Sequence, residues 1–279
     1  MGRARPVALI TGASSGIGAA FARELANRKY DLILVARRQD RLAELARGLA
    51  RSEGVTAETM VADLTRDPDV KSVAERLRAE ERLEMLINNA GFGTTGFFFE
   101  ADPTSQENMH RLHVLATVVL TRAALGPMVS RNRGAIINVS SVAAFIPSGA
   151  NVSYNSTKAW MNVFTESINL ELRALDSRVR AQALCPGFTM TEFHEKLGID
   201  RNRIFPNSGF WMPAGKVVRA SLAGLEKGDW LIVPGWRYKL LVFGLRHLPR
   251  IIREQAALVY SRKARGYVKP KEGDKVSGG

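Results

Sequence analysis

The chain has 279 residues, of which 46% are hydrophobic and 24% charged, and these proportions exclude a disordered chain and a bundle of membrane helices. Its single cysteine, Cys185, excludes an intramolecular disulfide and indicates a reducing compartment. The longest apolar stretch, Val114–Val129, carries Arg122 and is shorter than a membrane span. Because Met1–Pro6 is short and basic, we expect no signal peptide. We therefore expect a cytoplasmic protein.

The net charge of +13 is unevenly distributed along the chain. From Arg237 to Gly279 there are eleven basic and three acidic residues, so this tail carries +8 and residues 1–236 carry only +5. Such a charge favours an anionic ligand, a membrane surface or nucleic acid as a partner. No nucleic-acid-binding motif accompanies the charge, so we expect no nucleic-acid partner.

Short apolar runs alternate with segments of helical spacing along the chain. The predicted strands are Val7–Thr11, Asp31–Val35, Thr56–Val61, Leu83–Asn88, Ala135–Ser140, Arg178–Cys185 and Trp230–Val233. The predicted helices are Ser15–Arg28, Gln39–Arg51, Asp67–Glu81, Glu107–Arg131, Ser153–Leu175 and Ala214–Leu225. Apolar strands joined by helices predict a parallel sheet covered on both faces. We expect an α/β fold with one doubly wound Rossmann-type domain over residues 1–236, seven parallel strands, and a helical basic extension over 237–279.

A glycine-rich loop, Thr11–Gly18, follows the first predicted strand and opens the first helix. Glycines permit a tight turn and a close approach of the backbone to a diphosphate, and the helix amino terminus attracts negative charge. Arg37 and Arg38 stand at the end of the second strand, where this type of fold often places an acid that binds the adenosine ribose. An arginine fork suits a 2′-phosphate, which predicts NADP(H) as cofactor. The alternative is that both arginines are simply solvated at a helix start.

Polar residues end the next two strands. Asp63-Leu64 could meet the adenine or could cap a helix, and Asn88–Gly91 could hydrogen-bond beside a ligand or form an ordinary turn. Tyr154 and Lys158 share one face of a long helix. An ammonium beside a phenol is expected to lower its pKa from about 10 and so assist proton transfer. The preceding strand ends in Ser140-Ser141, at the same crevice.

Together these motifs resemble the short-chain dehydrogenase/reductase superfamily over residues 5–236. The motifs that carry the resemblance are Gly12, Gly16 and Gly18; Asp63; Asn88–Gly91; Ser141; Tyr154 with Lys158; and Pro186-Gly187 with Thr189 and Thr191. Ser141 precedes Tyr154 by thirteen residues, the family's spacing, which selects Ser141 over Ser140. The resemblance implies cofactor contacts by Gly12, Ser14, Ser15, Gly16, Ile17, Gly18, Arg37, Arg38, Asp63, Leu64, Asn89, Ala90, Gly91, Tyr154, Lys158, Pro186, Gly187, Phe188 and Thr189.

The resemblance also implies catalytic roles. Tyr154 donates a proton to the substrate oxygen, Lys158 lowers the tyrosine pKa and holds the nicotinamide ribose, and Ser141 hydrogen-bonds the carbonyl oxygen. The family usually has an asparagine in a proton relay at the position where this chain has His113. We include His113 as a candidate catalytic residue, with packing in a subunit interface as the alternative. His110 shares its helical face without further ligands, so no metal site is predicted.

The predicted function is NADP(H)-dependent reduction of a carbonyl in a small molecule, with a non-catalytic NADP(H)-binding protein as the alternative. The segment after Thr191 and a phenylalanine cluster form a candidate apolar substrate lining: Phe92, Phe97, Phe98, Phe99, Phe193, Leu197, Ile199, Ile204, Phe205, Phe210, Trp211 and Met212. This lining favours a ketone that is apolar, acyl or lipid-like, and lid packing or a dimer contact is the alternative. The layout loosely resembles the ketoacyl and mycolate-type reductase branch, and we expect a homodimer or homotetramer.

The basic tail contains a predicted amphipathic helix. Leu248–Arg265 has near-helical apolar spacing, and its basic residues lie on another face and cluster at the end. Such a helix could lie weakly on an anionic membrane. It could also cover the substrate pocket or pack in an oligomer interface, and we favour packing with an exposed basic rim.

Overall fold

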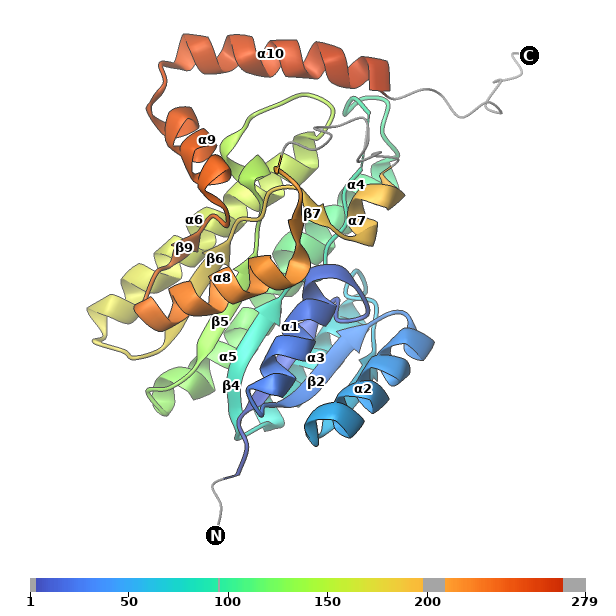
Figure 1. Cartoon of the computed structure of the whole chain (residues 1–279), viewed down its shortest axis with the longest axis vertical. Coiled ribbons are helices and arrows are strands. Elements are labelled where there is room, and N and C mark those ends of the chain that lie inside the picture. The colour runs from blue at the N-terminus through green and yellow to red at the C-terminus, as the bar shows by residue number, and fades with distance from the viewer. Residues whose placement is uncertain (1–3, 95, 198–208, 268–279) are drawn as a thin grey trace, which may run out of the picture.

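The computed structural model describes residues 4–94, 96–197 and 209–267. Within these ranges the central sheet consists of seven parallel strands (Figure 1). Their order is β3-β2-β1-β4-β5-β6-β9. The strands are β1 (Val7–Thr11), β2 (Asp31–Ala36), β3 (Ala57–Val61), β4 (Leu83–Asn88), β5 (Ala135–Val139), β6 (Arg180–Leu184) and β9 (Leu231–Ile232). The strand order reverses between β1 and β4, which creates a crevice at their carboxyl ends. The predicted α/β fold is confirmed.

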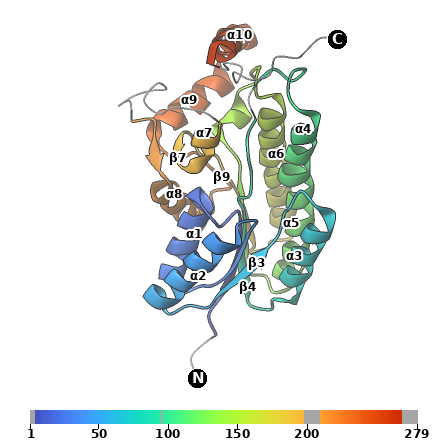
Figure 2. The same ribbon diagram turned by 90° about the vertical axis from the view of Figure 1, so that its right-hand side faces the viewer.

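Helices cover both faces of the sheet (Figure 2). One face is covered by α1 (Gly16–Asn27), α2 (Gln39–Glu53) and α8 (Ala214–Lys227), and the other by α3 (Asp67–Ala79), α5 (Thr117–Ser130) and α6 (Val152–Ala174). Each face has its own apolar core because the strands are buried on both sides. Phe21 and Leu25 of α1 anchor the first core, and Leu120 of α5 belongs to the second.

The predicted long helix Glu107–Arg131 is longer and less regular than expected. It consists of α4 (Pro103–His110), a π-helical segment η1 (Arg111–Ala116) and α5. The prediction missed the first turn, where the Asp102 side chain caps the helix by accepting a hydrogen bond from the Ser105 N–H at 2.7 Å. By length and composition this helix, Pro103–Ser130, is apolar enough to cross a membrane. It packs against α3 and β4, as a core helix does.

Small elements at the carboxyl ends of β5 and β6 were not predicted. They are η2 (Val142–Phe145), α7 (Glu192–Lys196) and a two-stranded sheet of β7 (Thr189–Met190) and β8 (Met212–Pro213). These pieces are too short to show a period in the sequence, yet they carry residues after Ser141 and after Pro186-Gly187. They therefore shape the crevice.

The basic carboxyl-terminal segment forms two helices, α9 (Trp236–His247) and α10 (Arg250–Tyr267) (Figure 1). The helix predicted at Leu248–Arg265 corresponds to α10, whereas α9 was not assigned. Tyr238 and Val242 of α9 are buried in the same core as α1 and α8. The apolar core therefore continues past residue 236, where we had placed the end of the domain.

Candidate active site

The glycine loop between β1 and α1 adopts a shape that only glycine tolerates. Gly12 and Gly16 have φ angles of +65° and +57°, in the left-handed region. A Cβ at Gly18 would lie 2.3 Å from the Gly12 carbonyl oxygen, so the helix can approach the loop only because this residue has no side chain. The first turn of α1 carries no acidic residue, which leaves its positive end available for an anion.

The end of β4 holds this loop in place. The backbone N–H groups of Asn89 and Ala90 both donate to the Thr11 hydroxyl, at 2.9 and 3.0 Å. The Asn89 side chain donates to the backbone carbonyls of Thr11 and Gly12. Asn89 and Ala90 are therefore brought to the glycine loop, whereas the Asn88 side chain donates to Thr121 of α5 and Asn138 of β5.

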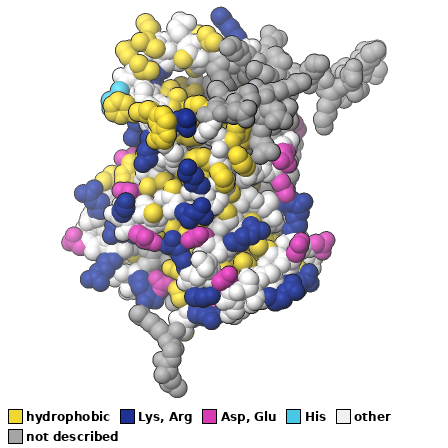
Figure 3. All heavy atoms as spheres, in the orientation of Figure 1, with side chains coloured by type: hydrophobic (Ala, Val, Ile, Leu, Met, Phe, Trp, Pro, Cys, Tyr) yellow, Lys and Arg dark blue, Asp and Glu magenta, His cyan; other side chains and the backbone are white. Residues whose placement is uncertain are grey.

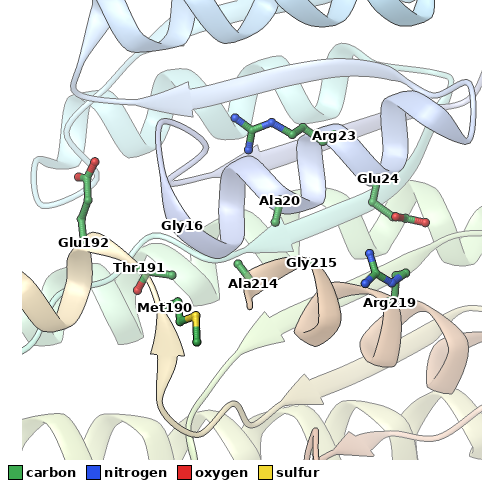
Figure 4. A pocket seen from close by; sticks show the side chains of 10 residues that line it. All are labelled: Gly16, Ala20, Arg23, Glu24, Met190, Thr191, Glu192, Ala214, Gly215 and Arg219. Atoms are coloured by element: carbon green, nitrogen blue, oxygen red, sulfur yellow. The ribbon is translucent and has the colours of Figure 1, made fainter. Parts of the chain in front are cut away.

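A cavity of 540 Å³ opens beside the glycine loop (Figure 4). Its lining comes from α1, from the segment between β7 and α7, and from the start of α8: Gly16, Ala20, Arg23, Glu24, Met190, Thr191, Glu192, Ala214, Gly215 and Arg219. Thr191 approaches Gly16 so closely that a Cβ there would lie 3.1 Å from the threonine methyl group. The loop that follows β6 thus meets the glycine loop across the crevice.

Arg38 is bound to the glycine loop more closely than Arg37. The Arg38 guanidinium donates to the Ser14 hydroxyl at 3.0 Å and to the Ser15 hydroxyl at 2.7 Å. It also forms a 2.8 Å ion pair with Glu192, which pairs with Arg41 as well. The Arg37 side chain is 69% exposed, and its nearest acid is Asp63 at 3.8 Å. Arg38, Ser14 and Ser15 together form a polar cluster that suits a phosphate group.

Asp63 stands at the end of β3, as predicted, and Leu64 is buried beside it. Partial burial disfavours the charged carboxylate, but hydrogen bonds from the Thr65 N–H and hydroxyl outweigh it and lower the Asp63 pKa. Asp63 is therefore ionised and its turn is closed by Thr65. The carboxylate therefore organises a turn ahead of α3 without capping that helix, and its contact with the adenine stays a prediction.

Ser141, Tyr154 and Lys158 come together at the end of β5. The Ser141 hydroxyl accepts a 3.1 Å hydrogen bond from the Ala143 N–H of η2 and bonds to the Tyr154 phenol. Lys158 is buried one helical turn after Tyr154, and its ammonium donates to the Val139 carbonyl at 2.8 Å. The ammonium lies 5.8 Å from the centre of the Tyr154 ring. The three predicted residues therefore form one cluster.

The titration of this cluster differs from the expectation. Burial raises the pKa of Tyr154 to about 12, and the Ser141 hydrogen bond lowers it only in part. Burial also lowers the pKa of Lys158 to about 8. The Lys158 ammonium donates to the Val139 carbonyl and is not among the groups that shift the Tyr154 pKa. At neutral pH, Tyr154 therefore keeps its proton, the state that a proton donor needs.

His113 lies within this cluster but does not form the expected relay. It is fully buried on the π-helical segment η1. Its Nε2 accepts from the Phe92 N–H at 3.3 Å, so its Nδ1 carries the proton and donates to the Thr157 hydroxyl at 3.0 Å. Burial and the nearby Lys158 charge lower its pKa well below 6.5. His113 is thus neutral, with both nitrogens occupied, and acts as a positioning residue between the Gly91 turn and α6.

The loop after β6 is fixed by a residue that the sequence did not reveal. The Tyr238 hydroxyl of α9 accepts from the Phe188 N–H at 2.8 Å and donates to the Phe210 carbonyl at 3.0 Å. Gly187 is required here because a Cβ would lie 2.0 Å from the Tyr238 ring. Thr189 donates to the Gly187 carbonyl at 3.0 Å, so the predicted Pro186–Thr189 segment is a closed turn. No local motif around Tyr238 marks this long-range role.

Aromatic side chains lie beside the reacting cluster. The Phe193 ring is 5.8 Å from the Tyr154 ring, and Phe92 is 6.1 Å from His113. Phe188 and Trp211 contact each other at 5.0 Å. Three predicted lining residues, Ile199, Ile204 and Phe205, lie outside the described residues. Within the described ranges no group of three His, Cys, Asp or Glu side chains is placed to hold a metal ion.

Comparison with known proteins identifies the family. Residues 6–202 match the family model of the short chain dehydrogenases. The chain belongs to the short-chain dehydrogenase/reductase family. It is 34% identical to a short-chain dehydrogenase from Sphingobium yanoikuyae in complex with NADPH, with a TM-score of 0.77 over 96% of this chain and 97% of the other. It is 30% identical to the bulky-bulky ketone specific alcohol dehydrogenase from Comamonas testosteroni, with a TM-score of 0.74 over 96% of each chain.

A plant protein provides a further comparison. The chain is 32% identical to very-long-chain 3-oxoacyl-CoA reductase-like protein At1g24470 from Arabidopsis thaliana over 85% of its own length and 75% of the relative's. Family membership makes the protein an oxidoreductase with a nicotinamide cofactor, which confirms the predicted enzyme class. The glycine loop and the Arg38 cluster fit this cofactor, since a glycine-rich turn at a helix amino terminus lies beside a guanidinium and two hydroxyls.

Proposed function

We propose that the protein reduces an apolar ketone to a secondary alcohol with NADPH. The observation that carries the proposal is the Ser141–Tyr154–Lys158 cluster with an aromatic ring, Phe193, against its proton donor. A carbonyl oxygen beside Tyr154 also meets the Ser141 hydroxyl, while an apolar substituent contacts Phe193. The names of the Comamonas and Arabidopsis relatives, a bulky ketone enzyme and a 3-oxoacyl-CoA reductase-like protein, support a ketone with large apolar substituents.

The reaction needs one hydride and one proton. NADPH, when bound, supplies the hydride to the carbonyl carbon. The Tyr154 phenol transfers its proton to the carbonyl oxygen, and the Ser141 hydroxyl hydrogen-bonds the resulting phenolate until solvent reprotonates it. Lys158 would hold the ribose of the bound cofactor, and His113 fixes the helix turn that carries Tyr154 through Thr157.

The preference for NADPH over NADH follows from the arginines after β2. Arg38 stands at the end of β2, where the adenosine ribose is expected, and its guanidinium is already held against the glycine loop by Ser14 and Ser15. A 2′-phosphate placed there gains charge-assisted hydrogen bonds that a 2′-hydroxyl lacks. The NADPH-bound Sphingobium relative supports this preference.

Self-association and location complete the proposal. We place the protein in the cytoplasm as a homodimer or homotetramer. Leu115, Val118 and Val119 are 54%, 38% and 38% exposed along one side of the continuous helix and provide an apolar contact surface. Light scattering after size-exclusion chromatography tests this point, and a monomer at all concentrations would contradict it.

The substrate class is tested by following NADPH oxidation at 340 nm with a panel of ketones. The panel contains bulky aryl ketones, a long-chain 3-oxoacyl thioester and short methyl ketones. We expect secondary alcohols as products, with the highest kcat/KM for the bulky or long-chain members. Equal activity on the small polar ketones would contradict the apolar substrate, and no reduction of any carbonyl would contradict the function.

A further inference from the structure

The carboxyl-terminal helices present apolar side chains to solvent instead of burying them. On α9 these are Trp236, Leu240 and Phe243, which are 63%, 60% and 62% exposed, and on α10 they are Ile251, Ile252, Leu258 and Val259, which are 72%, 48%, 48% and 51% exposed. Figure 3 shows hydrophobic side chains gathered over the helices at this end of the molecule. We name these seven residues the carboxyl-terminal apolar surface.

Few contacts hold α10 against the rest of the protein. The described side chains of α10 are exposed or half-buried. Among the described residues, its side chains hydrogen-bond to other elements through the Ser261 hydroxyl, which accepts from the Gly149 N–H at 2.8 Å, and through Arg253, which donates to the Leu245 carbonyl at 3.3 Å. A helix in a globular protein draws most of its stability from burying one face. An unburied apolar face of this length therefore indicates that another surface covers it.

The charge of the same helices decides which surface fits. From Trp236 to Tyr267 the sequence has eight lysines or arginines and one acid, Glu254. Glu254 is paired with Arg250 at 2.5 Å, and the Arg237 guanidinium stacks 4.7 Å from the Trp236 ring. Two copies of so basic a surface repel each other, which disfavours self-association through it. Basic side chains around exposed aliphatic and aromatic groups match an anionic lipid bilayer.

This surface lies next to the segment between η2 and α6, which leads into Tyr154. A side chain at Gly149 would contact both Ser261 of α10 and Phe97, so α10 adjoins the segment that carries the phenylalanine cluster. Phe98 and Phe99 of that cluster are 57% and 82% exposed. Tyr238 of α9 in turn fixes the Phe188 turn beside the reacting group. Contact with a bilayer through α9 and α10 therefore places the lipid boundary beside the active site.

We propose that α9 and α10 form a peripheral docking surface for anionic membranes. The apolar surface enters the boundary between headgroups and acyl chains, and the surrounding arginines and lysines bind lipid phosphates. Docking does not depend on the chemistry proposed for the crevice. It gives a lipid-like ketone a path to Phe97–Phe99 without passing through water.

The full-length protein is tested by flotation with phosphatidylcholine vesicles that contain about 30% phosphatidylglycerol, a composition that supplies a negative surface. We expect most of the protein to float with these vesicles at low salt. The bound fraction should fall at least about tenfold with pure phosphatidylcholine, or in high salt, which screens the charges. Equal flotation with neutral and anionic vesicles, or none with either, overturns the proposal.

Two variants separate the apolar and the basic contributions. Ile251→Ser with Ile252→Ser removes exposed apolar groups, and Lys239→Gln with Arg250→Gln and Arg262→Gln removes three charges. Each should reduce flotation severalfold and leave the thermal unfolding midpoint unchanged, because these side chains are exposed. The matched control, Val61→Ser with Leu175→Ser, changes apolar groups that are 55% and 66% exposed elsewhere and should float like the wild type.

Other occupants of the surface give different results. If a second copy of the chain covers this surface, the wild type should form a concentration-dependent dimer and should not float with vesicles. The double variant Ile251→Ser with Ile252→Ser should then abolish the dimer. These results together would overturn membrane docking. Insertion is read separately from Trp236 fluorescence. Lipids brominated along their acyl chains should quench it in the wild type, and Trp236→Phe should remove that quenching while flotation persists. Quenching unaffected by Trp236→Phe contradicts insertion of α9.

Discussion

The strand-end crevice buries polar side chains, whereas the carboxyl-terminal helices expose apolar ones. In the crevice, Lys158 and His113 are buried, and each has a specific partner. In the carboxyl-terminal helices the apolar side chains of Phe243 and Ile251 are exposed, and the segment that carries them is strongly basic. Burial and specific hydrogen bonds therefore hold the side chains of the reacting cluster in place, whereas the exposed apolar side chains of α10 suit contact with an external partner.

The helix α9 joins the two regions. It buries Tyr238 and Val242 in the main core, while Trp236 and Phe243 on the same helix remain exposed. Tyr238 reaches the turn beside the reacting cluster through two hydrogen bonds. The apolar core therefore ends along α9 itself, and substitutions on the two sides of this helix should have different consequences.

Stability should separate the two sides of α9 most strongly. Tyr238→Ala leaves a cavity and two unpaired backbone groups, and we expect it to lower the free energy of unfolding by about 3–5 kcal/mol. Phe243→Ala on the same helix should change it by less than about 0.5 kcal/mol because the ring is exposed. Urea unfolding measures both. Similar losses for the two variants would show that α9 packs as a whole.

Ser141→Ala should affect chemistry without affecting folding. The variant removes the hydroxyl that bonds to Tyr154, and we expect kcat for ketone reduction to fall by about 10²–10³. Ser130→Ala, at an exposed hydroxyl on α5, serves as the control and should retain normal activity. A Ser141→Ala enzyme with wild-type kcat would remove this residue from the proposed reaction.

Cofactor choice should depend on Arg38 more than on Arg37. Wild-type protein should bind NADPH at least about tenfold more tightly than NADH, a difference of about 1.4 kcal/mol. Arg38→Asp should abolish this preference because it also breaks the contacts with Ser14 and Ser15. Arg37→Asp should shift it less, since its side chain is mostly exposed. Titration of both cofactors against each variant decides between the two arginines.

A smaller effect is expected at Glu192, whose carboxylate pairs with Arg38 and Arg41. A 2′-phosphate at Arg38 competes with this carboxylate, so Glu192→Gln should tighten binding of 2′,5′-ADP. An exposed ion pair of about 0.2–1 kcal/mol allows up to about a fivefold change. Glu195→Gln on the same helix is the control, and 5′-ADP should bind equally to all three proteins. Weaker 2′,5′-ADP binding by Glu192→Gln would instead show that Glu192 orients the Arg38 guanidinium for the phosphate.

The sequence predicted the parts of the protein that depend on local pattern. The seven strands and the main helices follow from apolar periodicity, and the glycine loop and the Tyr154–Lys158 pair follow from their spacing. The roles of Tyr238 and Glu192 were not predicted, because both act on residues far away along the chain. Nor could spacing show that burial raises the Tyr154 pKa, which depends on packing around the phenol.

For the carboxyl-terminal segment, the sequence predicted the helix but not which of its side chains are buried. The apolar spacing of Leu248–Arg265 indicated a helix, and α10 is one. The spacing did not show which apolar residues the rest of the chain covers. We favoured packing with an exposed basic rim, and in the structure that description fits α9 better than α10. Exposure of Ile251 and Val259 is a property of the whole fold rather than of the helix.

The most direct test of the proposed chemistry compares Tyr154→Phe with the wild type, using the ketone that the wild type reduces best. The account predicts that NADPH binds to both proteins with nearly the same Kd, because the phenol hydroxyl is a small part of the cofactor site. It also predicts that ketone reduction by Tyr154→Phe falls at least about a hundredfold, because the proton donor is lost. A variant that binds NADPH and retains most of its reductase activity would contradict Tyr154 as the proton donor.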